Sequence, residues 1–415
     1  MNLNNTKIKQ ILFGILIIVI CGAIFYFTPS IVSKKIEYKS EDSFDNNKAN
    51  ENNLLNNNTG EKKINEISEV VAPIAVPVVV PVTHIETPDI VKAVYISSWV
   101  AGSPKFRDSI IKMIDETELN AIVIDIKDST GRIAFPISND EIMKLGAHEK
   151  RIPDIRWLTN LLHSKGIYII GRISVFQDPY LTKVKPEWAI TKKSDGTVWK
   201  DKKGLSFLDP ANSLVHKYTL DLALASYEVG FDEINFDYIR YPSDGNISDI
   251  NYRLAEGEKR ADKIEDFFKY LSTEIKKDVN IPISADLFGL TTEGTDDMGI
   301  GQVWEKAVPY FDFISPMVYP SHYPAGYAGY SNPSKYPYEV IKRSISSAIS
   351  RTKIINEDIN KIRPWLQDFD MGATYTKEMV EAQKKALYDL SLSSWMYWDP
   401  SNKYTPQAFK LENNQ

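Results

Sequence analysis

Short runs of β-branched and aromatic residues alternate with amphipathic stretches from residue 93 to residue 398. Such alternation predicts repeated βα units and a parallel sheet, whose strands are hydrophobic because helices cover them. Eight runs can be counted, which suggests that the sheet closes into a barrel. The predicted strands are Ala93–Trp99, Ala121–Lys127, Ile167–Val175, Glu233–Tyr238, Ile281–Leu287, Phe313–Tyr319, Arg363–Phe369 and Ser394–Trp398.

The stretches between these runs carry apolar residues at helical spacing, and two of them end at Gly166 and Gly230 as helix stops. After the eighth run only residues 406–411 could form a further helix, so the last outer helix is expected to be short or missing. An open doubly wound sheet is the alternative, but it would usually place a glycine-rich phosphate loop after its first strand. Here SSWVAGSPKF follows instead. The fold class is therefore predicted to be α/β, a (β/α)8 TIM barrel.

An uncharged apolar run of 17 residues, Ile11–Phe27, precedes the predicted barrel. As a helix it would extend about 26 Å, close to the roughly 30 Å thickness of the hydrocarbon layer. We interpret it as a single transmembrane anchor with a cytoplasmic N-terminus, and a cleaved signal peptide is the alternative. The barrel is expected to be extracellular, or secreted if the run is cleaved.

The segment after the apolar run is rich in Asn and Lys and then in Pro and Val, with little periodicity that could bury a core. Its last part reads VAPIAVPVVVPV, where recurring prolines favour an extended, polyproline-like chain. The predicted organisation is a tail and anchor over residues 1–28, a disordered linker over 29–88 and the barrel over 89–415.

Charge and cysteine content exclude several kinds of partner. The formal net charge is -6, with basic residues spread along the chain, so no basic footprint for nucleic acid is expected. The single cysteine, Cys21, lies in the apolar run, which rules out an intrachain disulfide or a cysteine zinc cluster in the barrel. With only five scattered histidines, no metal or other cofactor is predicted.

Carboxylates close several of the predicted strands. In GFDEINFDYIRYPSDG the alternation places Asn235 and Asp237 on one face, ISADLFG places Asp286 at the equivalent level, and WLQDFDMG supplies Asp368 and Asp370. The active site of such a barrel lies at the carboxyl ends of its strands. Glycoside hydrolysis needs two carboxyls, one as proton donor and one as nucleophile or base. We predict Asp237, Asp286 and Asp368 as catalytic, although strand caps or ion pairs are the alternative for each.

Other polar and aromatic residues near the strand ends could contact a sugar. Lys127 beside Asp125 could hold a hydroxyl or tune a pKa, although a structural ion pair is equally expected. Arginines can orient carboxylates through several fixed donors, and aromatic faces can stack on sugar rings, with buried packing as the alternative. The predicted substrate-binding set is Tyr95, Trp99, Asp125, Lys127, Arg172, Asn235, Arg240, Tyr319, His322, Trp365 and Trp398.

The segments VKAVYISSW, AIVIDIKDSTGRI, FDEINFDYIRYPSDG, ISADLFG and FISPMVYPSHY together resemble the bacterial "putative glycosyl hydrolase domain" family over roughly residues 89–410. This resemblance implies a barrel distantly similar to the α-amylases, in which fourth-strand, fifth-strand and seventh-strand carboxylates serve as nucleophile, acid/base and transition-state stabiliser. Asp237, Asp286 and Asp368 match these by strand order, although the fifth-strand residue would be Glu in an α-amylase.

The fourth strand is also similar to that of the chitinase family. Its D-x-x-D-x-D-x-E pattern appears here as Asp232, Asn235, Asp237 and Ile239, so the proton-donating Glu is replaced by Ile239. This replacement argues against chitinase-type cleavage, because Ile cannot protonate a leaving oxygen.

The predicted function is hydrolysis of a glycosidic bond in an extracellular or cell-envelope polysaccharide or oligosaccharide. A glycan-binding barrel without turnover is the first alternative. A polysaccharide deacetylase is the second, although it would need a His/Asp metal set that the sequence scarcely provides.

Overall fold

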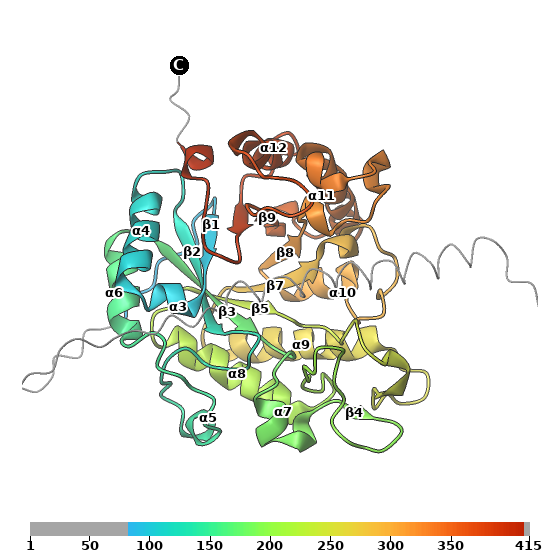
Figure 1. The fold of residues 1–415 in the computed structure, drawn as a ribbon. Helices are drawn as coiled ribbons and strands as arrows, with labels where there is room; N and C mark the ends of the chain where they lie inside the picture. The colour runs from blue at the N-terminus through green and yellow to red at the C-terminus, as the bar shows by residue number, and fades with distance from the viewer. Residues whose placement is uncertain (1–81, 411–415) are drawn as a thin grey trace, which may run out of the picture. The chain divides into compact units, whose positions relative to one another are not determined.

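The computed structural model describes residues 82–410, and the predicted membrane anchor lies outside them. Its centre is a closed barrel of parallel strands in the order β1-β10-β9-β8-β7-β5-β3-β2, which confirms the predicted TIM barrel (Figure 1). The barrel strands are β1 Lys92–Ile96, β2 Ala121–Lys127, β3 Tyr168–Ser174, β5 Glu233–Asp237, β7 Ile283–Phe288, β8 Phe313–Met317, β9 Trp365–Gln367 and β10 Trp395–Trp398.

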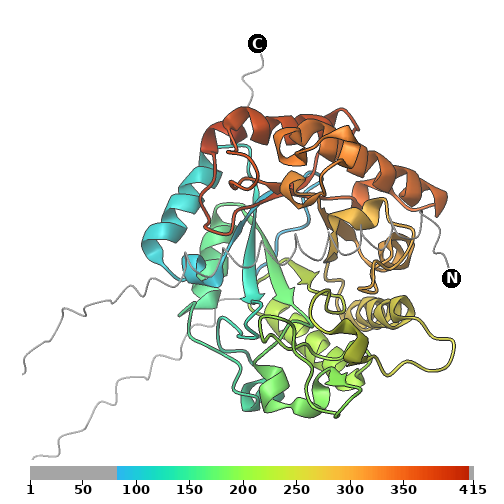
Figure 2. The same cartoon turned by 45° about the vertical axis from the view of Figure 1, so that its right-hand side comes forward.

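Helices surround the barrel as an outer ring (Figure 2). After β10 the described chain contains only a 3₁₀ turn, Pro406–Phe409, so the last outer helix is missing as expected. No helix within residues 82–410 is long and apolar enough to cross a membrane. The helices are α3 Ser98–Ala101, α4 Pro104–Asp115, α5 Asp140–Lys144, α6 Ile155–Ser164, α7 Leu181–Val184, α8 Ser213–Tyr227, α9 Arg260–Asp278, α10 Trp304–Ala307, α11 Pro337–Ile354 and α12 Lys377–Tyr388.

The barrel strands separate two apolar layers. One face of each strand packs under the helices in the main core, as Ile122 and Ile124 of β2 do. The other face fills the barrel interior, where Val123 and Tyr168 belong to a second, smaller apolar cluster. Because side chains alternate between the two faces, polar residues that alternate with core residues must enter the interior. The interior of this barrel is therefore partly polar.

The first predicted strand is wrong at its end. β1 stops at Ile96, and Trp99 lies in the short helix α3. Ser97 begins this helix as its N-cap, since its side chain accepts a hydrogen bond from the Val100 amide at 3.3 Å. A small antiparallel sheet of β4, Thr191–Lys192, and β6, Ile250–Asn251, joins two of the loops that follow barrel strands, and the sequence analysis did not predict it.

Residues assigned to the linker contact the amino-terminal ends of the strands. The Ile85 amide donates to Asp232 Oδ1 at 2.8 Å, and Thr87 Oγ1 lies 2.9 Å from the Tyr168 hydroxyl. Asp232 also accepts from the Ile169 amide at 2.8 Å and lies 3.0 Å from His163 Nε2. The first residue of the chitinase-like pattern therefore has a structural role at the end of the barrel opposite to the predicted site.

Candidate active site

Two of the three predicted catalytic carboxylates lie on neighbouring strands. Asn235 of β5 pairs in register with Ser284 of β7, and Phe236 pairs with Ala285. The same register brings Asp237 and Asp286 beside each other at the carboxyl ends of these strands. Both side chains are buried, with relative exposures of 7% and 1%. They form the predicted pair of carboxylates on one wall of the barrel mouth.

Asp237 is held by a guanidinium group. Arg172 of β3 donates from Nε to Asp237 Oδ2 at 3.1 Å, and its Nη2 forms an ion pair with the same oxygen. Asp237 Oδ1 accepts from the Tyr238 amide at 2.5 Å. Tyr238 adopts a φ of 52°, a conformation that non-glycine residues seldom take and that is found at functional sites. These contacts fix both oxygens of Asp237 in place.

Arg172 is itself fixed by Asp125, which binds Nη1 through Oδ1 at 2.6 Å. The other oxygen of Asp125 accepts from the Tyr95 hydroxyl at 2.6 Å. Burial raises the pKa of Asp125, and the Arg172 charge opposes this rise. Through these two contacts Asp125 positions Arg172, and its predicted contact with substrate stays a prediction.

Asp286 lies in a different environment. Its Oδ1 accepts from Asn235 Nδ2 at 2.8 Å and from Trp365 Nε1 at 2.8 Å, both of them uncharged donors. Burial, and then the negative charge of Asp237, raise the pKa of Asp286 well above its usual range. The two adjacent carboxyls thus lie in contrasting environments, Asp237 against a guanidinium and Asp286 against uncharged donors, and such contrast is how acid and base roles are separated in one site.

Aromatic rings line the region around the two carboxylates. The Trp398 ring is stacked on Tyr95 with centroids 3.8 Å apart, and it meets Trp365 edge-on at 5.7 Å. Trp398 is partly exposed, and the Arg172 guanidinium lies 5.1 Å from its ring centroid. Trp398 therefore offers ring surface beside Arg172, whereas Trp365 is buried and acts as a hydrogen-bond donor.

Tyr319 and His322 lie in the segment after β8, at the same end of the barrel as the two carboxylates. Their rings are 5.1 Å apart, and both pack edge-on against Phe369. The charges of Asp286 and Asp237 add to burial in raising the pKa of Tyr319. Burial lowers the pKa of His322 to about 4, so its ring is neutral near pH 7. Both side chains can border a bound substrate as neutral groups.

Lys127 is not brought together with the carboxylate pair. Its ammonium binds Asp178 Oδ2 at 2.7 Å and the Val175 carbonyl at 3.3 Å, and both partners are buried. The structure thus favours the ion-pair interpretation of Lys127, and the role in substrate binding has no support.

Trp99 and Arg240, two further residues of the predicted substrate-binding set, have cation–aromatic contacts. Trp99 is 62% exposed, with Arg151 stacked 4.8 Å from its ring, and Arg240 packs 4.7 Å from the Phe288 ring.

Asp368 also stands apart from the pair. Thr405 donates to both of its oxygens, from the amide at 2.7 Å and from Oγ1 at 2.8 Å. No hydrogen bond or ion pair connects it with Asp237 or Asp286 in the described part of the chain. The transfer of a catalytic role to Asp368 by strand order is therefore unsupported by these contacts.

The protonation of Asp368 is expected to couple to stability. Burial raises the pKa of Asp368 to about 7 in the folded chain, whereas an unfolded Asp titrates near its ordinary pKa of 3.8. The folded state then binds more protons between these pH values, so this group lowers stability as pH rises through that window. Asp368→Asn, which stays uncharged, is expected to match the parent near pH 4 and to melt at a higher temperature than the parent at pH 8. Thermal melts of both proteins across this range check the prediction, and equal melting temperatures at pH 8 would contradict it.

A buried polar network below the carboxylates was not predicted. Glu233 forms an ion pair with Arg363 and accepts from Ser284 Oγ at 2.5 Å and from Tyr168 at 3.1 Å. Strand alternation in GFDEINFD could have indicated it, because Glu233 shares a face with Asn235 and Asp237. Arg363 and Ser284 gave no such signal, since their partners lie on other strands.

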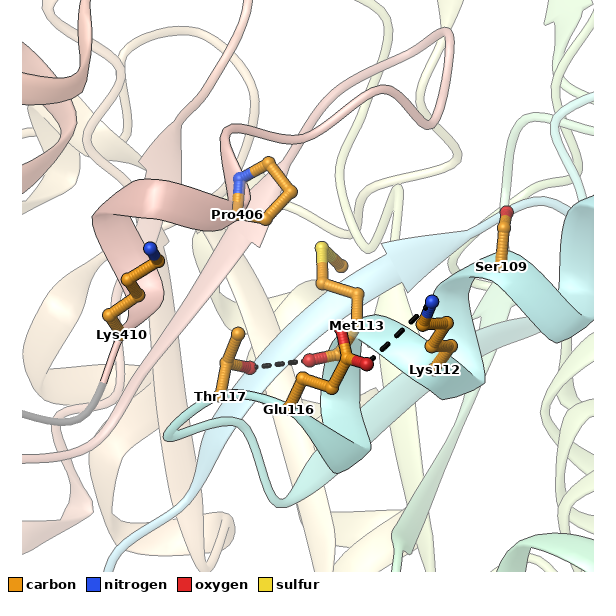
Figure 3. A pocket seen from close by; sticks show the side chains of 7 residues that line it. All are labelled: Ser109, Lys112, Met113, Glu116, Thr117, Pro406 and Lys410. Carbon is orange, nitrogen blue, oxygen red and sulfur yellow. Dashed lines mark hydrogen bonds and ion pairs between the residues drawn. The ribbon is translucent and has the colours of Figure 1, made fainter.

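A shallow pocket of about 300 Å³ lies elsewhere, on the outer surface between α4 and the 3₁₀ turn near the C-terminus (Figure 3). Its one carboxylate, Glu116, is 3.7 Å from Lys112. Outer helices run antiparallel to the strands, so the end of α4 lies at the opposite end of the barrel from the carboxylate pair. This pocket lacks paired carboxylates and is not the candidate site. Within residues 82–410 no three His, Cys, Asp or Glu side chains are grouped to hold a metal.

Comparison with solved structures found glycoside hydrolases. The glycoside hydrolase domain of PgaB (BpsB) from Bordetella bronchiseptica is 13% identical, with 78% of this chain and 99% of that chain covered and a TM-score of 0.56. A hypothetical protein from Ruminiclostridium thermocellum is 29% identical over 50% of this chain and 98% of its own, with a TM-score of 0.42. The α-galactosidase TtGalA from Thermus thermophilus, in complex with stachyose, is 13% identical, with 78% of this chain and 64% of that chain covered and a TM-score of 0.48.

The likeness to the PgaB domain supports the barrel fold. A search of curated proteins found no match. A family model matches residues 93–404, which include every barrel strand except the first residue of β1. The chain belongs to the family described as "putative glycosyl hydrolase domain".

Proposed function

We propose that this chain hydrolyses glycosidic bonds, with Asp237 as the nucleophile or base and Asp286 as the proton donor. The contrast between the two carboxyls carries the proposal. Asp237 is bound by the Arg172 guanidinium, and Asp286 is buried against uncharged donors with its pKa raised. Retaining and inverting mechanisms both require two carboxyls, one as proton donor and the other as nucleophile or base.

The other residues of the site fit positioning and binding roles. Arg172 orients Asp237, and Asp125 with Tyr95 holds Arg172 in place. Trp398 provides partly exposed ring surface for a sugar face. Ile239, which replaces the chitinase acid, is completely buried in the core and contributes no donor. Proton donation in this proposal therefore rests on Asp286 alone.

We further propose that the substrate is an extracellular or cell-envelope polysaccharide. The support comes from the sequence, in which the apolar run Ile11–Phe27 and a proline-rich segment precede the barrel. An anchor followed by an extended spacer would hold the barrel outside the membrane, within reach of envelope glycans.

The experiment is a digest of cell-wall and exopolysaccharide glycans by the full chain, with new reducing ends and free acetate measured in parallel. We expect reducing ends to appear from at least one glycan class. Acetate release without reducing ends would point to a deacetylase. Tight glycan binding with neither product would point to a binding barrel and would reject hydrolysis.

A further inference from the structure

Both hydrogen bonds that Asp286 receives converge on a single oxygen. Asn235 Nδ2 and Trp365 Nε1 each lie 2.8 Å from Oδ1. The other oxygen, Oδ2, accepts no hydrogen bond from residues 82–410. An indole N–H can only donate, so Oδ1 must present a lone pair to Trp365. The two oxygens of this carboxyl are therefore chemically unequal.

The amide of Asn235 could in principle be turned over, with its oxygen towards Asp286. Its orientation is fixed by the network beneath it. Ser284 Oγ donates to the Glu233 carboxylate at 2.5 Å, so the same Oγ is left to accept from Asn235 Nδ2 at 3.0 Å. Glu233 also forms a buried ion pair with Arg363, so its carboxylate is the acceptor for Ser284. Donation thus runs in one direction, from Asn235 to Ser284 and to Asp286.

We propose that Asn235 and Trp365 are positioning residues that fix the acidic proton of Asp286 on Oδ2. This inference rests on the proposed function, in which Asp286 is the donor. A carboxylic acid that accepts two N–H bonds at Oδ1 carries its proton on the opposite oxygen. Oδ2 is then the atom that gives its proton to the leaving oxygen, and it regains one from the incoming water or sugar hydroxyl when the acid is restored. Without these two N–H groups the acidic proton can occupy either oxygen of Asp286, and its position relative to the leaving oxygen is no longer fixed.

The same donors set how readily Asp286 ionises. N–H bonds stabilise the carboxylate more than the acid, so their removal raises the pKa of Asp286. Trp365→Phe keeps the ring but loses the donor, and Asn235→Ala removes the amide. The matched control is Trp395→Phe, since the Trp395 indole is equally buried but donates to the Tyr388 hydroxyl at 3.1 Å.

The test is a carboxyl ¹³C titration of full-length protein labelled at aspartate, with the Asp286 signal assigned by its loss in Asp286→Asn. We expect the midpoint of Asp286 to move to higher pH in Trp365→Phe and in Asn235→Ala, and to stay at the parent value in Trp395→Phe. Two variants guard against one that fails to fold. Midpoints equal to that of Trp395→Phe in both would overturn the inference.

Kinetics on a cleaved glycan separate this inference from the proposed function. In Trp365→Phe, kcat/KM is expected to fall about 10-fold to 100-fold through misplacement of the donor. The alkaline limb of its pH profile should move upward with the ¹³C midpoint. Midpoint shifts without turnover by the parent would reject the hydrolase and retain the positioning role. Turnover by the parent with unmoved midpoints in both variants would retain the hydrolase and reject the positioning role.

Discussion

Asp286→Asn is expected to lower the rate of glycan hydrolysis by about 10²-fold to 10⁴-fold, the usual contribution of a general acid. Asn cannot donate a proton to the leaving oxygen, although it keeps the shape of the side chain and can still accept from Asn235 or Trp365. The loss should therefore depend on the leaving group. On an aryl glycoside whose phenol leaves without protonation, the variant should retain most of the parent rate.

The measurement is kcat/KM of both proteins on the glycan and on the activated glycoside. Asp368→Asn serves as the matched control, because Asp368 is also a buried carboxyl but contacts Thr405 rather than the pair. A uniform loss on both substrates in Asp286→Asn would indicate a binding or folding defect. That result would remove Asp286 from the role of acid.

Arg363→Met is expected to lower the free energy of unfolding by about 3–5 kcal/mol. Arg363 and Glu233 are both completely buried, and removal of one partner leaves an uncompensated charge in the barrel interior. The remaining Glu233 would still accept from Ser284 and Tyr168, but those neutral donors cannot replace a guanidinium. Urea unfolding of the parent and the variant gives this difference.

The matched control is Arg343→Met, which breaks an ion pair with Glu293 on the surface, where the Arg343 side chain is 54% exposed. A change of about 1 kcal/mol or less is expected there. The double variant Arg363→Met with Glu233→Leu should be more stable than Arg363→Met alone, because no unpaired charge is buried. A single variant as stable as the parent would show that the pair does not hold the barrel interior.

The sequence was most informative where strand periodicity is regular. In β5 the alternation of Asn235 and Asp237 with core residues predicted their shared face, and the structure places both in the barrel interior. Asp286 was found by the same reasoning, since Ala285 and Leu287 on either side are core residues. Regular alternation thus predicted the interior face that carries the two carboxylates, and the count of eight runs predicted the closed barrel.

Periodicity failed where the backbone is irregular. The β2–β3 pairing shifts register between Asp125 and Lys127, which is a β-bulge. Strict alternation would place both side chains on one face, but a bulge re-aims the residues that follow it. Lys127 consequently reaches Asp178, in the loop after β3, instead of joining Asp125 at the site. Nothing in the local sequence DIKDSTG indicates the extra residue.

Contacts between distant strands were also beyond the sequence. Arg172 was expected near carboxylates, but its simultaneous binding of Asp237 and Asp125 depends on β3 lying between β2 and β5. Trp365 was predicted to bind sugar, yet its indole reaches Asp286 from β9 on another part of the barrel wall. Closure of the barrel decides which strands face each other, so residues adjacent in the sequence do not reveal such partners.

The most direct test of the account is the rate at which the full chain and its Asp237→Asn variant release reducing ends from the same glycan, at equal concentrations of folded protein. The variant retains the size of the side chain but loses the charge that Arg172 binds. A loss of about 10³-fold or more with unchanged glycan affinity is predicted, because a neutral amide can act neither as nucleophile nor as base. Release by Asp237→Asn at the parent rate would contradict a hydrolytic site centred on this pair of carboxyls.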